Sequence, residues 1–91
     1  MEFEWDEAKD AANIEKHGVS FATATRIFEG PVLTWIDDRN DYGEMREHSL
    51  GSIEGILVLA VIHTNRQGIH RIISARRANR SERKRYEEAI R

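Results

Sequence analysis

The sequence predicts an α+β fold in which two N-terminal helices precede an antiparallel sheet of about four strands, and a C-terminal helix follows the sheet. Three observations support this order. Apolar residues between positions 7 and 28 recur at helical spacing and are flanked by capping residues. From position 32 to 77, short polar turns separate runs rich in β-branched residues. Asn79 and Glu82 then form the pattern of a capping box, which predicts a helix over about 80–90.

The first helix is predicted over residues 7–17. Asp6 precedes it as an N-cap, because its carboxylate can accept the backbone N–H groups that the first turn leaves unpaired. Cations occupy the last turn, and Gly18 suits the left-handed position that follows a helix. Before this helix, the alternation of apolar and acidic residues at 3–5 suits a brief strand or an anchor.

A second helix is predicted after Ser20, which is its N-cap. Phe21 begins a narrow apolar stripe that continues three and seven positions further on, at Ala24 and Phe28. The helix ends at Gly30-Pro31, because proline cannot continue a helix and disfavours helical geometry in the residue before it.

The predicted strands cover residues 32–36, 44–50, 56–63 and 71–77. The loop 37–43 and the turns 51–55 and 64–68 separate them, and turns this short imply an antiparallel meander. The 56–63 run is the most apolar and is expected at the centre of the sheet. In the last strand, simple alternation places Arg71, Ile73, Ala75 and Arg77 on one face and Ile72, Ser74 and Arg76 on the other.

Length and composition indicate one small domain over residues 1–91. The chain has no cysteine, which excludes disulfides and thiolate metal sites and fits a reducing cytosol. No apolar run approaches the roughly 20 residues that span a bilayer, and the acidic start lacks the basic region of a signal peptide. We therefore expect a cytoplasmic protein without a membrane partner.

The formal net charge of −2 conceals a strong asymmetry along the chain. Residues 1–65 carry five basic and thirteen acidic side chains, whereas residues 66–91 carry nine basic and three acidic ones. A basic block of this kind can attract polyanions. It could equally be neutralised by the acidic half or dock on an acidic partner, and composition does not choose between these alternatives.

The residues available for chemistry are basic and aromatic. The four histidines are scattered without the spacing of a metal motif, and there is no glycine-rich phosphate loop or nucleophile elbow. The sequence therefore predicts neither a metal nor a cofactor. Metal-free RNA cleavage needs a base, an acid and cations that stabilise the phosphorane, and histidine, lysine, arginine and tyrosine can supply them. Structural roles are the alternative: His17 as a helix-end cation, His63 as a strand-end residue and Tyr86 as a packing residue.

Two separated motifs resemble those of the BrnT family of bacterial toxins. The first is Phe3-Glu4-Trp5-Asp6 with Lys9, Asn13 and Lys16-His17-Gly18-Val19-Ser20-Phe21, and the second is Arg71-Ile72-Ile73-Ser74-Ala75-Arg76-Arg77-Ala78 with Arg83 and Tyr86. Between them, Glu44-Met45-Arg46 and Val61-Ile62-His63-Thr64 fall where the family carries a Glu-x-Arg and a strand that ends in histidine. The resemblance covers nearly the whole chain and shows no clear departure from the family pattern.

The resemblance implies a RelE-like fold and an endoribonuclease toxin of a type II toxin–antitoxin system that inhibits translation. Its partners would be an RNA substrate and a BrnA-like antitoxin with a ribbon-helix-helix domain, in a heterotetramer that reaches operator DNA only through the antitoxin. The family's conserved polar positions correspond here to Lys16, His17, Arg46, His63, Arg71, Arg76 and Tyr86.

Two hypotheses of function follow. The leading one is a metal-independent ribonuclease, because bases, acids and cations are spread over the sheet and the tip of the first helix. The alternative is a non-catalytic module that docks an antitoxin or nucleic acid through the basic C-terminal block. For the enzyme, we expect Arg46, Arg71 and Arg76 to converge on one concave surface with His63 at its rim. The alternative is that Arg46 and Arg76 are each held in a buried pair with a carboxylate.

Overall fold

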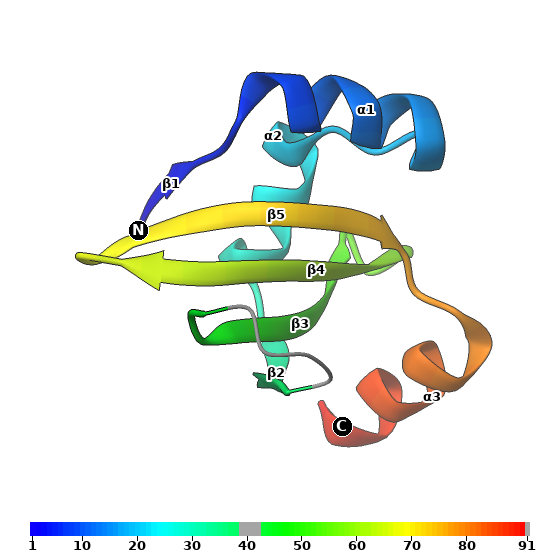
Figure 1. Ribbon diagram of the computed structural model, residues 1–91. Helices are drawn as coiled ribbons and strands as arrows, with labels where there is room; N and C mark the ends of the chain where they lie inside the picture. Colours follow the sequence, from blue (N-terminus) through cyan, green and yellow to red (C-terminus); the bar gives the residue numbers. More distant parts are fainter. Residues whose placement is uncertain (39–42, 91) are drawn as a thin grey trace.

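The computed structural model describes residues 1–38 and 43–90, which form a five-stranded mixed sheet covered by helices on both faces (Figure 1). The strands are β1 (Glu2–Glu4), β2 (Val32–Asp37), β3 (Arg46–Ile53), β4 (Leu57–Arg66) and β5 (Ile69–Arg77). The helices are α1 (Glu7–His17), α2 (Phe21–Ala24), the 3₁₀ helix η1 (Thr25–Glu29) and α3 (Arg80–Ala89). The predicted α+β class and the order of the elements are confirmed.

The prediction of about four antiparallel strands needs correction at the N-terminus. The strand order is β1-β5-β4-β3-β2, and β1 pairs with β5 in parallel, with Phe3 opposite His70. The antiparallel meander from β2 to β5 is as predicted. The sequence did not predict β1 as a strand of this sheet, because three residues are too few for alternation to distinguish a strand from an anchor. Its partner strand, β5, is also remote in the sequence.

The second helix is less regular than predicted. Ser20 caps it by accepting a hydrogen bond from the Thr23 N–H at 3.0 Å, but the α-helix lasts only four residues and continues as η1. Its fully buried residues, Phe21, Ala24 and Ile27, are spaced by three, which is the period of a 3₁₀ helix. Ile27 therefore takes the core position that the α-helical period assigned to Phe28.

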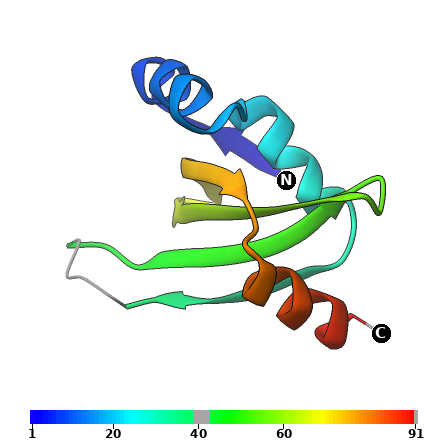
Figure 2. The same ribbon diagram turned by 90° about the vertical axis from the view of Figure 1, so that its right-hand side faces the viewer.

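The helices divide between the two faces of the sheet. Figure 2 shows α1, α2 and η1 on one face, here called the α1 face, and α3 on the other, here called the α3 face. Each face has its own apolar cluster, centred on Phe21, Ile27 and Leu59 on the α1 face and on Leu50 and Tyr86 on the α3 face. The central strands are therefore buried on both sides, and β3 has buried residues in succession at 48–51 rather than in alternation.

A β-bulge in β5 changes which arginines share a face. The pairing between β4 and β5 shifts by one residue between Ile62 and His63, so that Ile73 is the extra residue. Beyond this point the alternation is inverted, which places Arg71 opposite Thr64 and Arg76 opposite Ala60, both on the α3 face. The predicted assignment of these two arginines to opposite faces is therefore wrong.

Candidate functional site

A pocket of about 360 Å³ opens on the α3 face, between the sheet and the N-terminal end of α3. Its lining comes from β2, β3, β5 and α3, and consists of Trp35, Ile36, Asp37, Asp38, His48, Arg76, Asn79 and Glu82. An aromatic ring, an imidazole, a guanidinium and carboxylates therefore meet in one hollow.

Glu82 connects the polar groups of this pocket. Its carboxylate accepts two hydrogen bonds from the Arg76 guanidinium, at 2.7 and 2.9 Å, and one from the Asn79 backbone N–H at 2.9 Å. The same carboxylate also lies 3.5 Å from the Nε2 atom of His48, measured from its Oε2 atom. The hydrogen bonds from Arg76 lower the pKa of Glu82 by more than burial raises it. They therefore favour the ionised carboxylate.

His48 is held by neighbouring strands as well as by Glu82. It lies opposite Trp35 in the β2–β3 pairing, and the two rings stack with their centroids 4.3 Å apart and an angle of 24° between the planes. The histidine is only 6% exposed, and its place in a regular ladder gives its ring a defined position. An imidazole beside an ionised carboxylate is a candidate for general acid–base chemistry.

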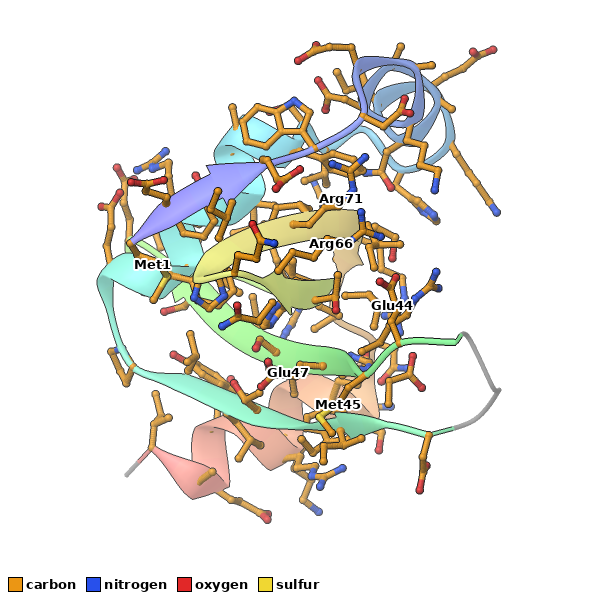
Figure 3. The ribbon with its side chains drawn as sticks, turned by 60° about the vertical axis from the view of Figure 1, so that its left-hand side comes forward. Met1, Glu44, Met45, Glu47, Arg66 and Arg71 are labelled. Atoms are coloured by element: carbon orange, nitrogen blue, oxygen red, sulfur yellow. The ribbon has the colours of Figure 1, made fainter. Side chains whose placement is uncertain are left out.

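Further arginines continue the α3 face beyond the pocket. Arg46 lies opposite Asp37 at the start of β3, with its Nε atom 3.8 Å from the Glu44 carboxylate. Arg66 also pairs with Glu44, at 3.0 Å, and Arg71 pairs with Glu4 (Figure 3). This face thus carries several guanidiniums whose charge is partly balanced by carboxylates.

The family assignment rests on the sequence comparison. A model of the ribonuclease toxin BrnT of type II toxin–antitoxin systems matches residues 5–82. The chain belongs to this family. It is therefore a ribonuclease toxin, and the family implies an RNA substrate and an antitoxin partner. This assignment favours the enzyme over the non-catalytic module.

A solved structure agrees with this assignment. The crystal structure of the ribonuclease toxin BrnT of Brucella abortus, at 1.1 Å resolution, superposes with a TM-score of 0.65 and 26% sequence identity. The alignment covers 88% of this chain and 99% of the Brucella chain. No curated protein matches the chain by sequence.

His63 lies on the face opposite the pocket of this BrnT-family chain. Its Nε2 is 2.7 Å from the Ser49 hydroxyl, and its ring meets Phe28 edge-on at 5.1 Å. It is only 2% exposed, and burial, with the nearby His70 and His48, lowers its pKa to about 4. The predicted position of His63 at the rim of the arginine surface is therefore wrong.

Of the seven predicted site residues, Arg76 alone lines the pocket. Arg46 and Arg71 lie beyond it on the same face, and three further residues also lie outside it. Lys16 and His17 form the last turn of α1, which covers the opposite face of the sheet (Figure 2). Tyr86 packs in the α3-face cluster, and its hydroxyl donates to the Pro31 carbonyl at 2.9 Å. A catalytic role for these residues stays a prediction.

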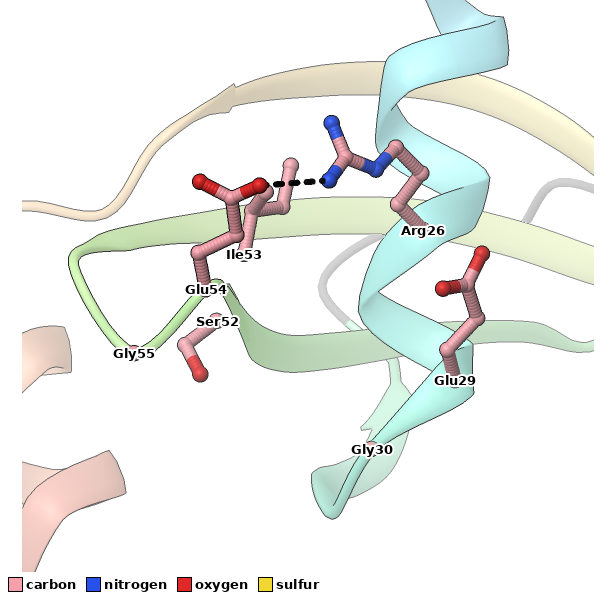
Figure 4. A pocket seen from close by; sticks show the side chains of 7 residues that line it. All are labelled: Arg26, Glu29, Gly30, Ser52, Ile53, Glu54 and Gly55. Carbon is pink, nitrogen blue, oxygen red and sulfur yellow. Dashed lines mark hydrogen bonds and ion pairs between the residues drawn. The ribbon is translucent and has the colours of Figure 1, made fainter.

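A second hollow, of about 280 Å³, is formed where η1 meets the β3–β4 turn (Figure 4). Arg26 and Glu54 form an exposed ion pair of 3.3 Å across it. None of the predicted site residues lines this hollow.

The described residues, 1–38 and 43–90, contain neither a metal-ligand cluster nor a membrane-spanning helix. No group of three His, Cys, Asp or Glu side chains could hold a metal ion there. No helix in that part of the chain is long and apolar enough to cross a membrane.

Of the eight residues that line the pocket, only Arg76 was predicted as a site residue from the sequence, and three of the others are central to its chemistry. Glu82 was assigned only to the capping box, which the structure confirms, and Trp35 only to a strand. His48 was weighed with the other histidines but not retained. The available signal was the alternation around residues 46–50, which puts Arg46 and His48 on the same face of a strand.

Proposed function

We propose that this BrnT-family toxin is an endoribonuclease that cleaves RNA without a metal ion, and that the α3-face pocket is its catalytic site. The observation that carries the proposal is the arrangement of His48, Glu82 and Arg76, which places an imidazole beside a carboxylate and a guanidinium in a pocket. In transesterification at phosphorus, the imidazole can transfer the proton, the carboxylate can stabilise the imidazolium, and the guanidinium can stabilise the negative charge of the transition state.

In the proposed reaction, the substrate's own 2′-hydroxyl is the nucleophile. Neutral His48 accepts the 2′-OH proton while the 2′ oxygen bonds to phosphorus, and Glu82 stabilises the resulting imidazolium. The bond between phosphorus and the 5′ oxygen then breaks, and His48 returns the proton to that oxygen. The products are a 2′,3′-cyclic phosphate and a 5′-hydroxyl. DNA lacks the nucleophile and is bound without being cut.

Arg76 supplies charge to the transition state. Its side chain is 37% exposed, so a phosphate can approach it while Glu82 holds the orientation of the guanidinium. Arg46 and Arg71, which occupy the same face, are proposed to bind the flanking phosphates. Lys16, His17, His63 and Tyr86, which match conserved polar positions of the family, remain further candidates, and substitution of each in the same assay tests them.

We further propose the partners and setting that the resemblance implies. One RelE-like domain over residues 1–91 would act in the cytoplasm and inhibit translation. A BrnA-like ribbon-helix-helix antitoxin would neutralise it in a heterotetramer, and operator DNA would be bound only through the antitoxin. Membership of a type II toxin–antitoxin family supports this proposal.

The experiment compares RNA cleavage by the wild type and by Arg76→Gln and His48→Gln, in EDTA. We expect each substitution to lower kcat/KM by about 10²–10³-fold, the usual cost of removing one preorganised group from a transition state. Arg26→Gln is the matched control for Arg76→Gln, because Arg26 also forms an ion pair with a glutamate but lies at the second hollow. It should cleave as fast as the wild type.

The products provide an independent test of the mechanism. Cleavage should leave a 2′,3′-cyclic phosphate, detected by mass spectrometry. Products with a 5′-phosphate, or activity that EDTA abolishes and Mg²⁺ restores, would refute metal-independent transesterification.

A further inference from the structure

Trp35 presents a partly exposed aromatic surface at the edge of the catalytic pocket. It belongs to β2, which is one of the two edge strands of the described sheet, and its ring lines the pocket beside His48. The guanidinium carbon of Arg85, on α3, lies 4.3 Å from the centre of the same ring. Three planar groups from three elements are therefore gathered where an RNA chain would enter the site.

We propose that Trp35 is the platform on which a base of single-stranded RNA stacks, next to the phosphate that is cleaved. This inference rests on the proposed function of the α3-face pocket. In the free protein Arg85 covers the ring. When RNA binds, the base replaces the guanidinium, and Arg85 pairs with a neighbouring phosphate.

The relative strength of the two contacts favours this exchange. A cation–π contact at an exposed site contributes about two- to fivefold to an equilibrium constant. Stacking of a base on an aromatic side chain contributes about five- to 150-fold. Arg85 is exposed to solvent, so its displacement costs little, and a phosphate then offers it a full opposite charge.

The other neighbour of the ring is less easily replaced. His48 is buried, is fixed by pairing with both β2 and β4, and contacts Glu82. A base that stacks on Trp35 in the place of Arg85 would therefore lie on the ring face opposite His48, with the indole between the base and the imidazole that is proposed to act on the 2′-hydroxyl. Stacking at this position requires an unpaired base, which defines single-stranded RNA as the substrate class.

The test uses the fluorescence of Trp35. The chain has two tryptophans, and Trp5 packs against Phe21 on the α1 face, so Trp5→Phe leaves Trp35 as the single reporter. The probe is a short RNA oligonucleotide with 2′-O-methyl riboses, which cannot be cleaved. We expect saturable quenching by this probe and at least fivefold weaker binding of the same oligonucleotide with abasic positions. The Trp35→Phe variant, which keeps Trp5, should show no quenching.

Arg85→Gln measures the predicted phosphate contact. It should weaken binding of the 2′-O-methyl probe about two- to tenfold, whereas Arg83→Gln, on the same helix but about 200° around its axis, should not. Because Trp35 is unchanged in both variants, these measurements do not depend on the folding of a Trp35 substitution.

The outcomes separate this inference from the proposed function. Quenching without RNA cleavage would support the platform and refute the ribonuclease site. Cleavage without quenching, or equal binding of normal and abasic probes, would overturn the platform while leaving the ribonuclease site intact.

Discussion

Two buried histidines on adjacent strands, His48 and His63, have different surroundings in this protein. His48 contacts a carboxylate and a tryptophan ring on the α3 face, whereas His63 contacts a serine hydroxyl and a phenylalanine ring on the α1 face. The sheet separates them because their positions in β3 and β4 point to opposite faces.

At the residue scale, we predict that His63 makes stability depend on pH. Its folded-state pKa of about 4 is below the ordinary value of 6.5, so between these values the unfolded chain binds a proton that the folded chain does not. The free energy of unfolding should therefore fall as the pH is lowered through this range, by roughly 2–3 kcal/mol.

Urea unfolding at pH 7.5 and pH 4.5 measures this effect. His63→Gln retains a neutral partner for Ser49 and does not titrate, so its stability should fall less over the same range. An equal fall in the variant and the wild type would assign the pH dependence to other groups.

At the element scale, Asn13 joins α1 to the sheet. Its side-chain amide donates to the carbonyls of Val19 and Ala75, at 2.8 and 2.7 Å, and its oxygen accepts from the Ala75 N–H at 3.2 Å. It is only 7% exposed. A single side chain therefore forms hydrogen bonds with the backbone of the segment after α1 and with the backbone of β5. These bonds fix the helix on the sheet.

Asn13→Ala should destabilise the protein by about 2–4 kcal/mol, because it leaves buried backbone groups of two elements without a partner. The measurement is the midpoint of urea unfolding. Asn65→Ala is the matched control, since the Asn65 oxygen also accepts a backbone hydrogen bond, from Gly68, but in an exposed turn. A loss equal to that of the control would show that Asn13 does not join the two elements.

The packing of η1 on β3 also belongs to this scale. A Cβ atom at Gly51 would lie 2.6 Å from the Ile27 Cβ, so only glycine lets the short helix approach the strand this closely. Ile27, the buried residue of η1, therefore packs directly against the backbone of β3.

At the scale of the whole molecule, basic side chains are concentrated in the C-terminal part of the chain. The C-terminal residues 66–91, with nine basic and three acidic side chains, supply β5 and α3, which border the pocket. RNA binding should therefore depend strongly on salt, with log K falling by about 0.7 for each phosphate contacted per tenfold rise in salt.

For three to five phosphates, we predict a slope of about −2 to −4 in a plot of log K against log salt. Fluorescence anisotropy with the 2′-O-methyl probe, between 50 and 300 mM KCl, would measure it, with single-stranded DNA as the control that binds with a similar slope but is not cut. A slope near zero would contradict an electrostatic interface on the α3 face.

The sequence by itself determined the class of the fold, the order of its elements and the family. Caps such as Asp6 and Asn79 were predictable because they bind backbone groups within three residues, and the structure confirms both. The family motifs likewise lie in contiguous segments.

Only the tertiary structure decided which of the predicted residues share a site. The β5 bulge brings Arg71 and Arg76 to one face, and strand pairing separates them from His63. Trp35, His48 and Glu82 are remote in the sequence and meet through the β2–β3 register and the packing of α3. Such contacts depend on register and on the approach of separate elements, which local periodicity does not specify.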